Sequence, residues 1–196
     1  MLLNKLKEYT IVLASQSPRR KELLKGMGLN FVIEKPVTNE KNPSKLSSVQ
    51  LVEYLALQKA KAVSSLYDLE NSIVIGGDTI VCMDDIVMGK PKTKEDAGNM
   101  LNQLSGKKHI VISGLCLIHK HKIAYDHDIT HVCFNELSSK EIDYYIKKYE
   151  PFDKAGAYGI QEWIGYIGIN RIEGSYYNVM GLPTHLLWNM LEEVLK

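Results

Sequence analysis

The segment Leu13–Arg20 concentrates groups that can bind an anion. It places two hydroxyls, those of Ser15 and Ser17, directly before two guanidiniums, those of Arg19 and Arg20. A helix expected from Arg19 onward would add free backbone N–H groups and a positive dipole end, and both favour phosphate. An arginine can also hold two phosphate oxygens at once. An ordinary capped helix with solvated arginines fits the same pattern, so the segment alone leaves both interpretations open.

A carboxylate lies at or inside an apolar strand in the sequence Gly76-Gly77-Asp78-Thr79. Such a group is costly to bury unless it is paired or binds a metal. The two glycines favour a functional role, because they let backbone or ligand come close and are otherwise poor strand residues. A structural aspartate at a strand end is the alternative. Asp78 is therefore a candidate for the reacting group.

Lys90 is a candidate cation between Gly89 and Pro91. The proline stands where a phosphate-binding P-loop requires a hydroxyl residue, so the sequence does not match a P-loop nucleoside triphosphatase. A single lysine could still form an ion pair with a triphosphate, although a lysine in a turn usually contacts only solvent.

The stretch Asp153–Gln161 is rich in small residues and could wrap closely around a flat ligand. Gln161 offers a hydrogen-bond donor and an acceptor that suit the edge of a nucleobase, and Tyr158 could stack on the base or simply pack. A glycine-bearing surface loop is the alternative interpretation.

The histidines and cysteines form no recognisable metal or nucleophile motif. The pairs His119-x-His121 and His127-x-x-x-His131 lack companion ligands at a diagnostic spacing, so we expect solvated or hydrogen-bonded histidines. The three cysteines are widely separated and odd in number, which indicates reduced core thiols. They are Cys82, Cys116 and Cys133. No pattern recommends covalent catalysis.

Alternating strand and helix patterns would position these residues. Helices are expected over 19–27, 47–66, 93–104, 138–149 and 183–195, with capping boxes at Ser47 and Ser138. Strands are expected over 9–13, 73–83 (interrupted at 76–78), 86–88, 110–118 and 123–134, and in short pieces over 156–181. The adjacent hairpins predict a mixed sheet flanked by helices in an α/β fold, and not a purely parallel sheet.

Length and charge point to one compact unit that binds its anion locally. The chain has 196 residues, and 24 basic against 23 acidic side chains give a formal charge of +1. This net charge is too small to attract the protein electrostatically to a nucleic acid polymer or a membrane. The longest apolar runs are far short of the roughly 20 residues of a membrane helix, and no signal peptide is recognisable at the start. We therefore expect a cytosolic protein.

Four segments, in this order, resemble the successive signatures of the Maf family of nucleotide pyrophosphatases. They are Leu13–Arg20, Gly77–Thr79 with Gly89–Pro91, Asp153–Gln161 and Gly174–Pro183. Secondary matches at Lys59, from Met100 to His109 and at Ser113-Gly114 extend the resemblance over residues 10–195. One motif would be weak support, but four in sequence are highly specific.

The resemblance implies an α/β fold related to that of the inosine triphosphate pyrophosphatases. Helices would flank a mixed twisted sheet, and two lobes without a separable linker would form one domain over residues 1–196 around a central nucleotide cleft. The implied reaction is hydrolysis of a nucleoside triphosphate between its α and β phosphates, which gives a monophosphate and pyrophosphate. Such an enzyme would remove or control nucleotides, including modified ones.

The resemblance also assigns roles to residues in the triphosphate site. Asp78 matches the family's proton acceptor, and the phosphate-contacting positions are Ser15, Arg19, Lys59 and Lys90. Glu40 matches a metal-assisting carboxylate, although the segment from Lys35 to Asn42 departs from the usual pattern.

A divalent metal, Mg²⁺ or Mn²⁺, would help to neutralise the triphosphate. Glu40 and Asp78 are the expected ligands. Whether Asp78 orients the attacking water or holds the metal stays open.

Three positions resemble those of the subgroup that acts on dTTP and UTP. They are Arg19, Thr79 and Gln161, where the subgroup that favours 7-methyl-GTP carries other residues. A neutral Gln161 amide can form hydrogen bonds with the acceptor–donor–acceptor edge of thymine or uracil, whereas a glutamate at this position would repel the carbonyl oxygens of the base.

Two other functions remain as alternatives. One is a non-catalytic nucleotide-sensing module linked to cell division, and the other is an inosine or xanthosine triphosphate pyrophosphatase. Retention of Asp78, Lys59 and Lys90 favours turnover, because a pure binder gains nothing from a carboxylate aimed at phosphate. A homodimer is expected from the family and from the commonness of symmetric pairs.

Overall fold

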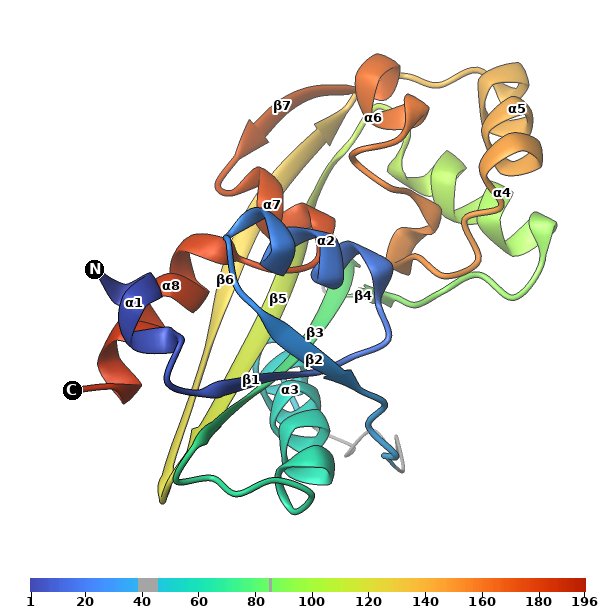
Figure 1. The fold of residues 1–196 in the computed structure, drawn as a ribbon. Coiled ribbons are helices and arrows are strands. Elements are labelled where there is room, and N and C mark those ends of the chain that lie inside the picture. The colour runs from blue at the N-terminus through green and yellow to red at the C-terminus, as the bar shows by residue number, and fades with distance from the viewer. Residues whose placement is uncertain (39–45, 85) are drawn as a thin grey trace. The chain divides into compact units, whose positions relative to one another are not determined.

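The structure is a computed structural model that describes residues 1–38, 46–84 and 86–196. Its strands are β1 (Thr10–Ala14), β2 (Phe31–Glu34), β3 (Ser72–Met83), β4 (Ile86–Met88), β5 (Lys108–His119), β6 (Lys122–Phe134) and β7 (Ile169–Glu173). Its helices are α1 (Leu2–Leu6), α2 (Pro18–Gly26), α3 (Ser48–Ser64), α4 (Lys94–Leu104), α5 (Ser139–Tyr149), the 3₁₀ turn η1 (Ala155–Ala157), α6 (Trp163–Gly168), α7 (Tyr176–Met180) and α8 (Thr184–Val194) (Figure 1).

The strands form one mixed sheet in the order β2-β1-β3-β5-β6-β7, with β4 attached to β3. Strand β1 pairs in parallel with both β2 and β3, whereas the β3–β4 and β6–β7 pairs are antiparallel. The mixed α/β fold class predicted from the sequence is therefore confirmed.

The chain divides into two compact units. Unit 1 comprises Met1–Asp78, Ser113–Asp128 and Gly181–Lys196, and unit 2 comprises Thr79–Ile112 and Ile129–Met180. Among the described residues, no helix combines the length and apolar character that crossing a bilayer requires.

Helix α3 packs on one face of the strands of unit 1. Its capping box is formed as predicted: Ser47 Oγ accepts from Gln50 N–H, and the Gln50 side chain accepts from Ser47 N–H. The core beneath the helix consists of Val12, Ala14, Ala56, Ala60, Val63, Val74, Cys116 and Ile118. The face that contains Leu51 and Leu55 is only half-buried, because the small residues at 56 and 60 let the helix approach the strands through a different face.

Two glycines explain how closely α3 approaches. A Cβ added to Gly76 would lie 2.2 Å from Ala56 O, and one added to Gly114 would lie 2.5 Å from Val52 O. Any side chain at these positions would push the helix away. Strand β3 is also continuous through residues 76–78, so the predicted interruption is wrong: the glycines admit the helix and do not end the strand.

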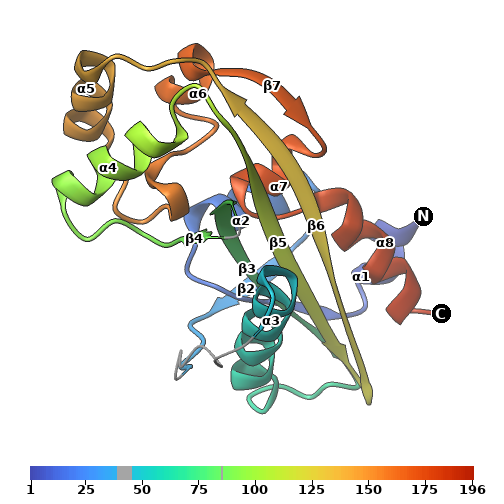
Figure 2. The ribbon, with the colours of Figure 1, turned by 180° about the vertical axis from the view of Figure 1, so that it is seen from behind.

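Helix α2 covers the opposite face of the same strands. Successive strand residues point to opposite faces, and a Cβ on Gly77 would lie 3.4 Å from Arg20 Nε, on the side away from α3. The strand–loop–helix predicted around residues 9–27 is present, and Gly28 adopts a left-handed conformation (φ +76°) after the helix. Helices α1 and α8 lie beside each other near the two chain ends (Figures 1 and 2).

Unit 2 contains helices α4 and α5, both with complete capping boxes, at Thr93 and Ser138. The predicted hairpin of β3 and β4 is present, with Val81 opposite Met88. The region 156–181 differs from the prediction, because it holds η1, α6 and α7 and one strand, β7. Its glycines serve tight turns: a Cβ on Gly165 would lie 1.8 Å from Ile160 O, where the chain turns into α6.

Candidate active site

Asp78 and Lys59 form an ion pair in unit 1. Lys59 Nζ, on α3, donates a hydrogen bond to Asp78 Oδ1, on β3, and each side chain is 16% exposed. The pair follows from the packing, because Gly76 and Asp78 point to the face that α3 covers. The close approach of α3 therefore brings an ammonium group onto the candidate carboxylate.

Arg20 is the second cation beside Asp78, and it is buried. Its Nε donates to Gly181 O at 2.8 Å, and its Nη1 donates to Ser15 Oγ at 3.3 Å. Desolvation lowers the pKa of Arg20 most, the Asp78 carboxylate opposes that shift, and Arg19 adds to it. The family resemblance assigned the phosphate contact to Arg19, which is only half-buried. Helical spacing could have identified Arg20, because it shares a face with buried Leu23 and Leu24.

No side chain caps the start of α2, which distinguishes it from the capped helices α3, α4 and α5. Ser17 occupies the N-cap position but makes no capping hydrogen bond with its side chain, and Pro18 follows without an N–H. Buried Ser15 accepts from Ser17 N–H at 3.2 Å instead. The capped-helix alternative for this segment is therefore disfavoured, and the positive end of the α2 dipole can attract an anion.

These groups form one continuous polar cluster. Ser15 contacts Arg20, Arg20 lies beside Asp78, and Asp78 pairs with Lys59. Two cations and one carboxylate leave a net positive charge that suits phosphate. The carboxylate lies where it can hold a water molecule or a metal against that phosphate.

The remaining candidates that the structure describes belong to unit 2. Thr79 is half-buried in β3, and Lys90 is exposed just after β4. Gly156 N–H donates to Gly89 O at 3.1 Å, so the Lys90 segment and the 153–161 segment are joined. Glu40 lies outside the described residues.

Gln161 is half-buried, and its Oε1 is closed off from solvent without a hydrogen-bond partner among the described residues. A buried acceptor without a donor is costly unless a ligand or water satisfies it.

A buried network fixes the segment that carries Gln161. Tyr145 OH accepts from Gly159 N–H at 3.0 Å and donates to Glu162 Oε2. Lys154 Nζ lies 2.7 Å from Asp153 Oδ1 and 3.1 Å from Glu162 Oε1. Desolvation first, and then the Glu162 hydrogen bond, raise the pKa of Tyr145. The segment is therefore held by its own charges and is not a loose surface loop.

Two histidines behave as the sequence predicts, since both are buried and hydrogen-bonded. His109 Nε2 lies 2.8 Å from Tyr158 OH, and His119 Nδ1 lies 2.9 Å from Ser72 O. Burial lowers the pKa of His109 to about 4, so it is neutral at pH 7. Tyr158 packs edge-on against His109 and Phe134, which supports packing rather than stacking on a base.

Asn178 gives the first part of the motif Gly174–Pro183, up to Met180, a structural role in unit 2. Its Nδ2 donates to Val111 O at 3.2 Å and to Thr130 Oγ1 at 2.9 Å, which ties α7 to β5 and β6.

Comparison with known proteins gives a consistent result. The family model described as Maf-like protein matches residues 10–194. A curated dTTP/UTP pyrophosphatase of Porphyromonas gingivalis is 48% identical over 194 residues, which covers 98% of each chain. One of Phocaeicola vulgatus is 47% identical and covers 98% of this chain and 100% of its own. Among solved structures, the Staphylococcus aureus Ham1 protein shares the fold, with a TM-score of 0.51 at 16% identity over 94% of this chain and 98% of its own.

Proposed function

The chain belongs to the Maf-like protein family, and from this premise we propose that it hydrolyses dTTP and UTP to the monophosphate and pyrophosphate. The relatives named dTTP/UTP pyrophosphatase, which match nearly the whole chain at 45–48% identity, support the substrate class. The observation that carries the proposal is the Asp78–Lys59 pair beside buried Arg20, since it combines a carboxylate with two phosphate-binding cations.

The residues of unit 1 would act on the triphosphate as follows. A triphosphate carries about four negative charges at neutral pH, which the ammonium and guanidinium groups offset. Lys59 can exchange its contact with Asp78 for a phosphate oxygen. That exchange leaves the Asp78 carboxylate to accept a proton from the water that attacks the α phosphorus, and pyrophosphate then leaves. Ser15, Arg19 and the first turn of α2 are the further proposed phosphate contacts.

We further propose a requirement for Mg²⁺ or Mn²⁺. Asp78 fits such an ion, because Mg²⁺ in nucleotide sites is commonly held by one or two carboxylates together with substrate phosphates. Glu40 is the second proposed ligand. When bound, the ion supplies further charge neutralisation and a lower pKa for a coordinated water. Excess chelator should abolish activity and added Mg²⁺ should restore it, whereas full activity in chelator would contradict the requirement.

Recognition of the base is proposed to fall to Gln161, with Thr79 and Arg19 as the other specificity positions and Lys90 as a phosphate contact. The unpartnered Oε1 of Gln161 supports this assignment, because an acceptor held ready can take the N3–H of thymine or uracil. Cytosine lacks that N–H, and leaving the polar groups unpaired costs about 1–3 kcal/mol.

The experiment is a panel of nucleoside triphosphates with analysis of both products. We expect dTTP and UTP to give monophosphate and pyrophosphate, with kcat/KM at least ~10-fold above CTP, dCTP and 7-methyl-GTP. Gln161→Glu should reduce that preference, whereas Gln103→Glu, the same change at an exposed position of α4, should not. A best substrate of CTP, 7-methyl-GTP or an inosine or xanthosine nucleotide would contradict the substrate assignment. Binding without any product would favour the sensing module.

A cytosolic location and a homodimer complete the proposal. Light scattering at micromolar concentration tests the dimer, and a single species of 22.2 kDa would contradict it.

A further inference from the structure

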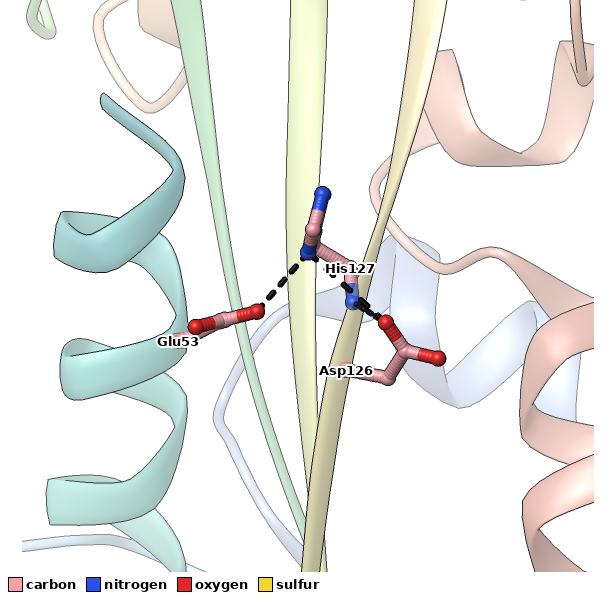
Figure 3. Close-up of side chains that lie close together, drawn as sticks. All are labelled: Glu53, Asp126 and His127. Carbon is pink, nitrogen blue, oxygen red and sulfur yellow. Dashed lines mark hydrogen bonds and ion pairs between the residues drawn. The ribbon is translucent and has the colours of Figure 1, made fainter. Parts of the chain in front are cut away.

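A group of three metal-ligating side chains lies in unit 1, apart from the residues assigned to the nucleotide. Glu53 projects from α3, and Asp126 and His127 project from β6 (Figure 3). The helix and the strand that supply them are 74 residues apart at the Glu53–His127 contact. Folding therefore brings together an imidazole and two carboxylates that no sequence motif connects.

The imidazole nitrogen lies between the two carboxylates. His127 Nδ1 is 2.7 Å from Glu53 Oε1 and 3.7 Å from Asp126 Oδ1, and one ligand atom of each residue lies within 4.8 Å of the others. Asp126 Oδ1 is oriented by the backbone of the strand, since it accepts from His127 N–H at 2.8 Å. The Glu53 and His127 side chains are 21% and 29% exposed, whereas Asp126 is 55% exposed.

These separations are close to what a small divalent ion requires. Ligand atoms that lie about 2.0–2.2 Å from a tetrahedral Zn²⁺ are roughly 3.3–3.6 Å from each other. The two distances from His127 Nδ1 lie on either side of that range, and the ligand atoms of all three residues lie within 4.8 Å of one another, so small side-chain rotations would suit a shared ion. The exposed side of Asp126 leaves room for water to complete the coordination.

The charges and the ligand types select the class of ion. With a neutral imidazole, the two carboxylates carry a charge of −2, which matches one divalent cation. A nitrogen ligand suits Zn²⁺, Co²⁺ or Ni²⁺ but not Mg²⁺, which prefers oxygen ligands. We propose that Glu53, Asp126 and His127 form a binding site for a divalent transition-metal ion, Zn²⁺ being the expected occupant.

Such an ion would join α3 to β6. Helix α3 also carries Lys59, six residues after Glu53 and about 9 Å further along the helix axis. A bound ion would therefore hold the helix that presents Lys59 to Asp78. Because metal binding to the folded state alone raises stability, the ion should also raise the melting temperature of the full-length protein.

The test uses Co²⁺ as a spectroscopic probe and Zn²⁺ in isothermal titration calorimetry, both on the full chain without nucleotide. We expect one equivalent of each ion to bind, millimolar Mg²⁺ not to displace it, and visible Co²⁺ absorption to appear. His127→Gln and Glu53→Gln should each weaken binding at least tenfold. His185→Gln is the matched control, because it removes a 58% exposed imidazole that lies 3.8 Å from Asp128 and is not one of the three proposed ligands. Its affinity for Zn²⁺ should equal that of the unmodified protein.

The alternative is a plain ion pair, in which a protonated His127 joins the two carboxylates. It predicts that His127→Gln and the unmodified protein bind Zn²⁺ equally, and that result would overturn the proposal. Loss of the bound equivalent in His185→Gln, or displacement by Mg²⁺, would overturn it as well. If either main variant fails to fold by circular dichroism, Asp126→Asn replaces it, since that side chain is mostly exposed and should also lose affinity.

Discussion

Arg20 should contribute more to the stability of the protein than any surface arginine, because its charge is buried against specific partners. We consider Arg20→Met, which keeps an unbranched side chain but removes the guanidinium. Gly181 O loses the Arg20 donor at 2.8 Å, Ser15 Oγ loses one of its two donors, that at 3.3 Å, and Asp78 keeps its contact with Lys59.

The magnitude follows from these contacts. A buried acceptor left without a donor costs about 1–3 kcal/mol, and breaking one side of a buried charge pair costs about 3–5 kcal/mol. Because Lys59 continues to pair with Asp78 and methionine needs no desolvation, we expect a net loss of about 2–4 kcal/mol. Arg20→Lys keeps the positive charge but not the several N–H donors of the planar guanidinium, so its loss of stability should be smaller, about 1–2 kcal/mol.

Equilibrium unfolding in urea measures both variants. With a slope of about 2 kcal/mol per molar urea, Arg20→Met should lower the midpoint by about 1–2 M. Arg19→Met, the same change at the half-buried neighbour, is the control and should lose less than about 1 kcal/mol. Equal losses for the two variants, or no loss for Arg20→Met, would refute the role assigned to the buried guanidinium.

Three further outcomes are expected. Burial lowers the pKa of His109 from 6.5 to about 4, so the unfolded chain takes up this proton before the folded one, and the stability from neutral His109 is lost as pH falls from 6.5 toward 4. Between pH 7 and 4.5, the free energy of unfolding of His109→Gln should therefore fall by about 2–3 kcal/mol less than that of the unmodified protein. Tyr145→Phe removes the hydroxyl that bonds Gly159 N–H and Glu162, so it should lower the free energy of unfolding by about 1–3 kcal/mol and reduce the ratio of kcat/KM for dTTP to that for CTP. Tyr149→Phe is the control and should change neither quantity. Gly76→Ala places a Cβ 2.2 Å from Ala56 O, so thermal unfolding should show a stability loss of about 1–3 kcal/mol or more. Gly98→Ala is the control: the nearest atom to its added Cβ is 3.8 Å away, so the change should be neutral or stabilising.

Local patterns predicted much of the fold. The strand–loop–helix around Ser15, the capping boxes at Ser47 and Ser138 and the hairpin at Asp84 depend on residues close together in sequence, and all are present. The prediction of short strands over 156–181 misses the helices α6 and α7. In the structure, Gly165 instead permits a tight turn into a helix.

The arrangement of the site depends on contacts between distant residues. The glycine pair before Asp78 suggested a close approach, but only the structure identifies α3 as the element that comes close. Lys59 became a candidate through the family resemblance and not through a pattern of its own. The Glu53–His127 contact spans 74 residues, and neither residue type is unusual on a helix or strand surface, so no local pattern could have predicted it.

Turnover by Asp78→Asn tests the central claim most directly. Asparagine can still accept from Lys59, so the fold and nucleotide binding should change little, whereas the loss of a proton acceptor should lower kcat for dTTP by about 10² or more. Steady-state kinetics with quantified dTMP and pyrophosphate, alongside calorimetric nucleotide binding, gives both values. A variant that binds dTTP as the unmodified protein does and hydrolyses it at least ~10²-fold more slowly is the predicted result. Unchanged kcat in that variant would contradict the assignment of Asp78 as the group that activates water.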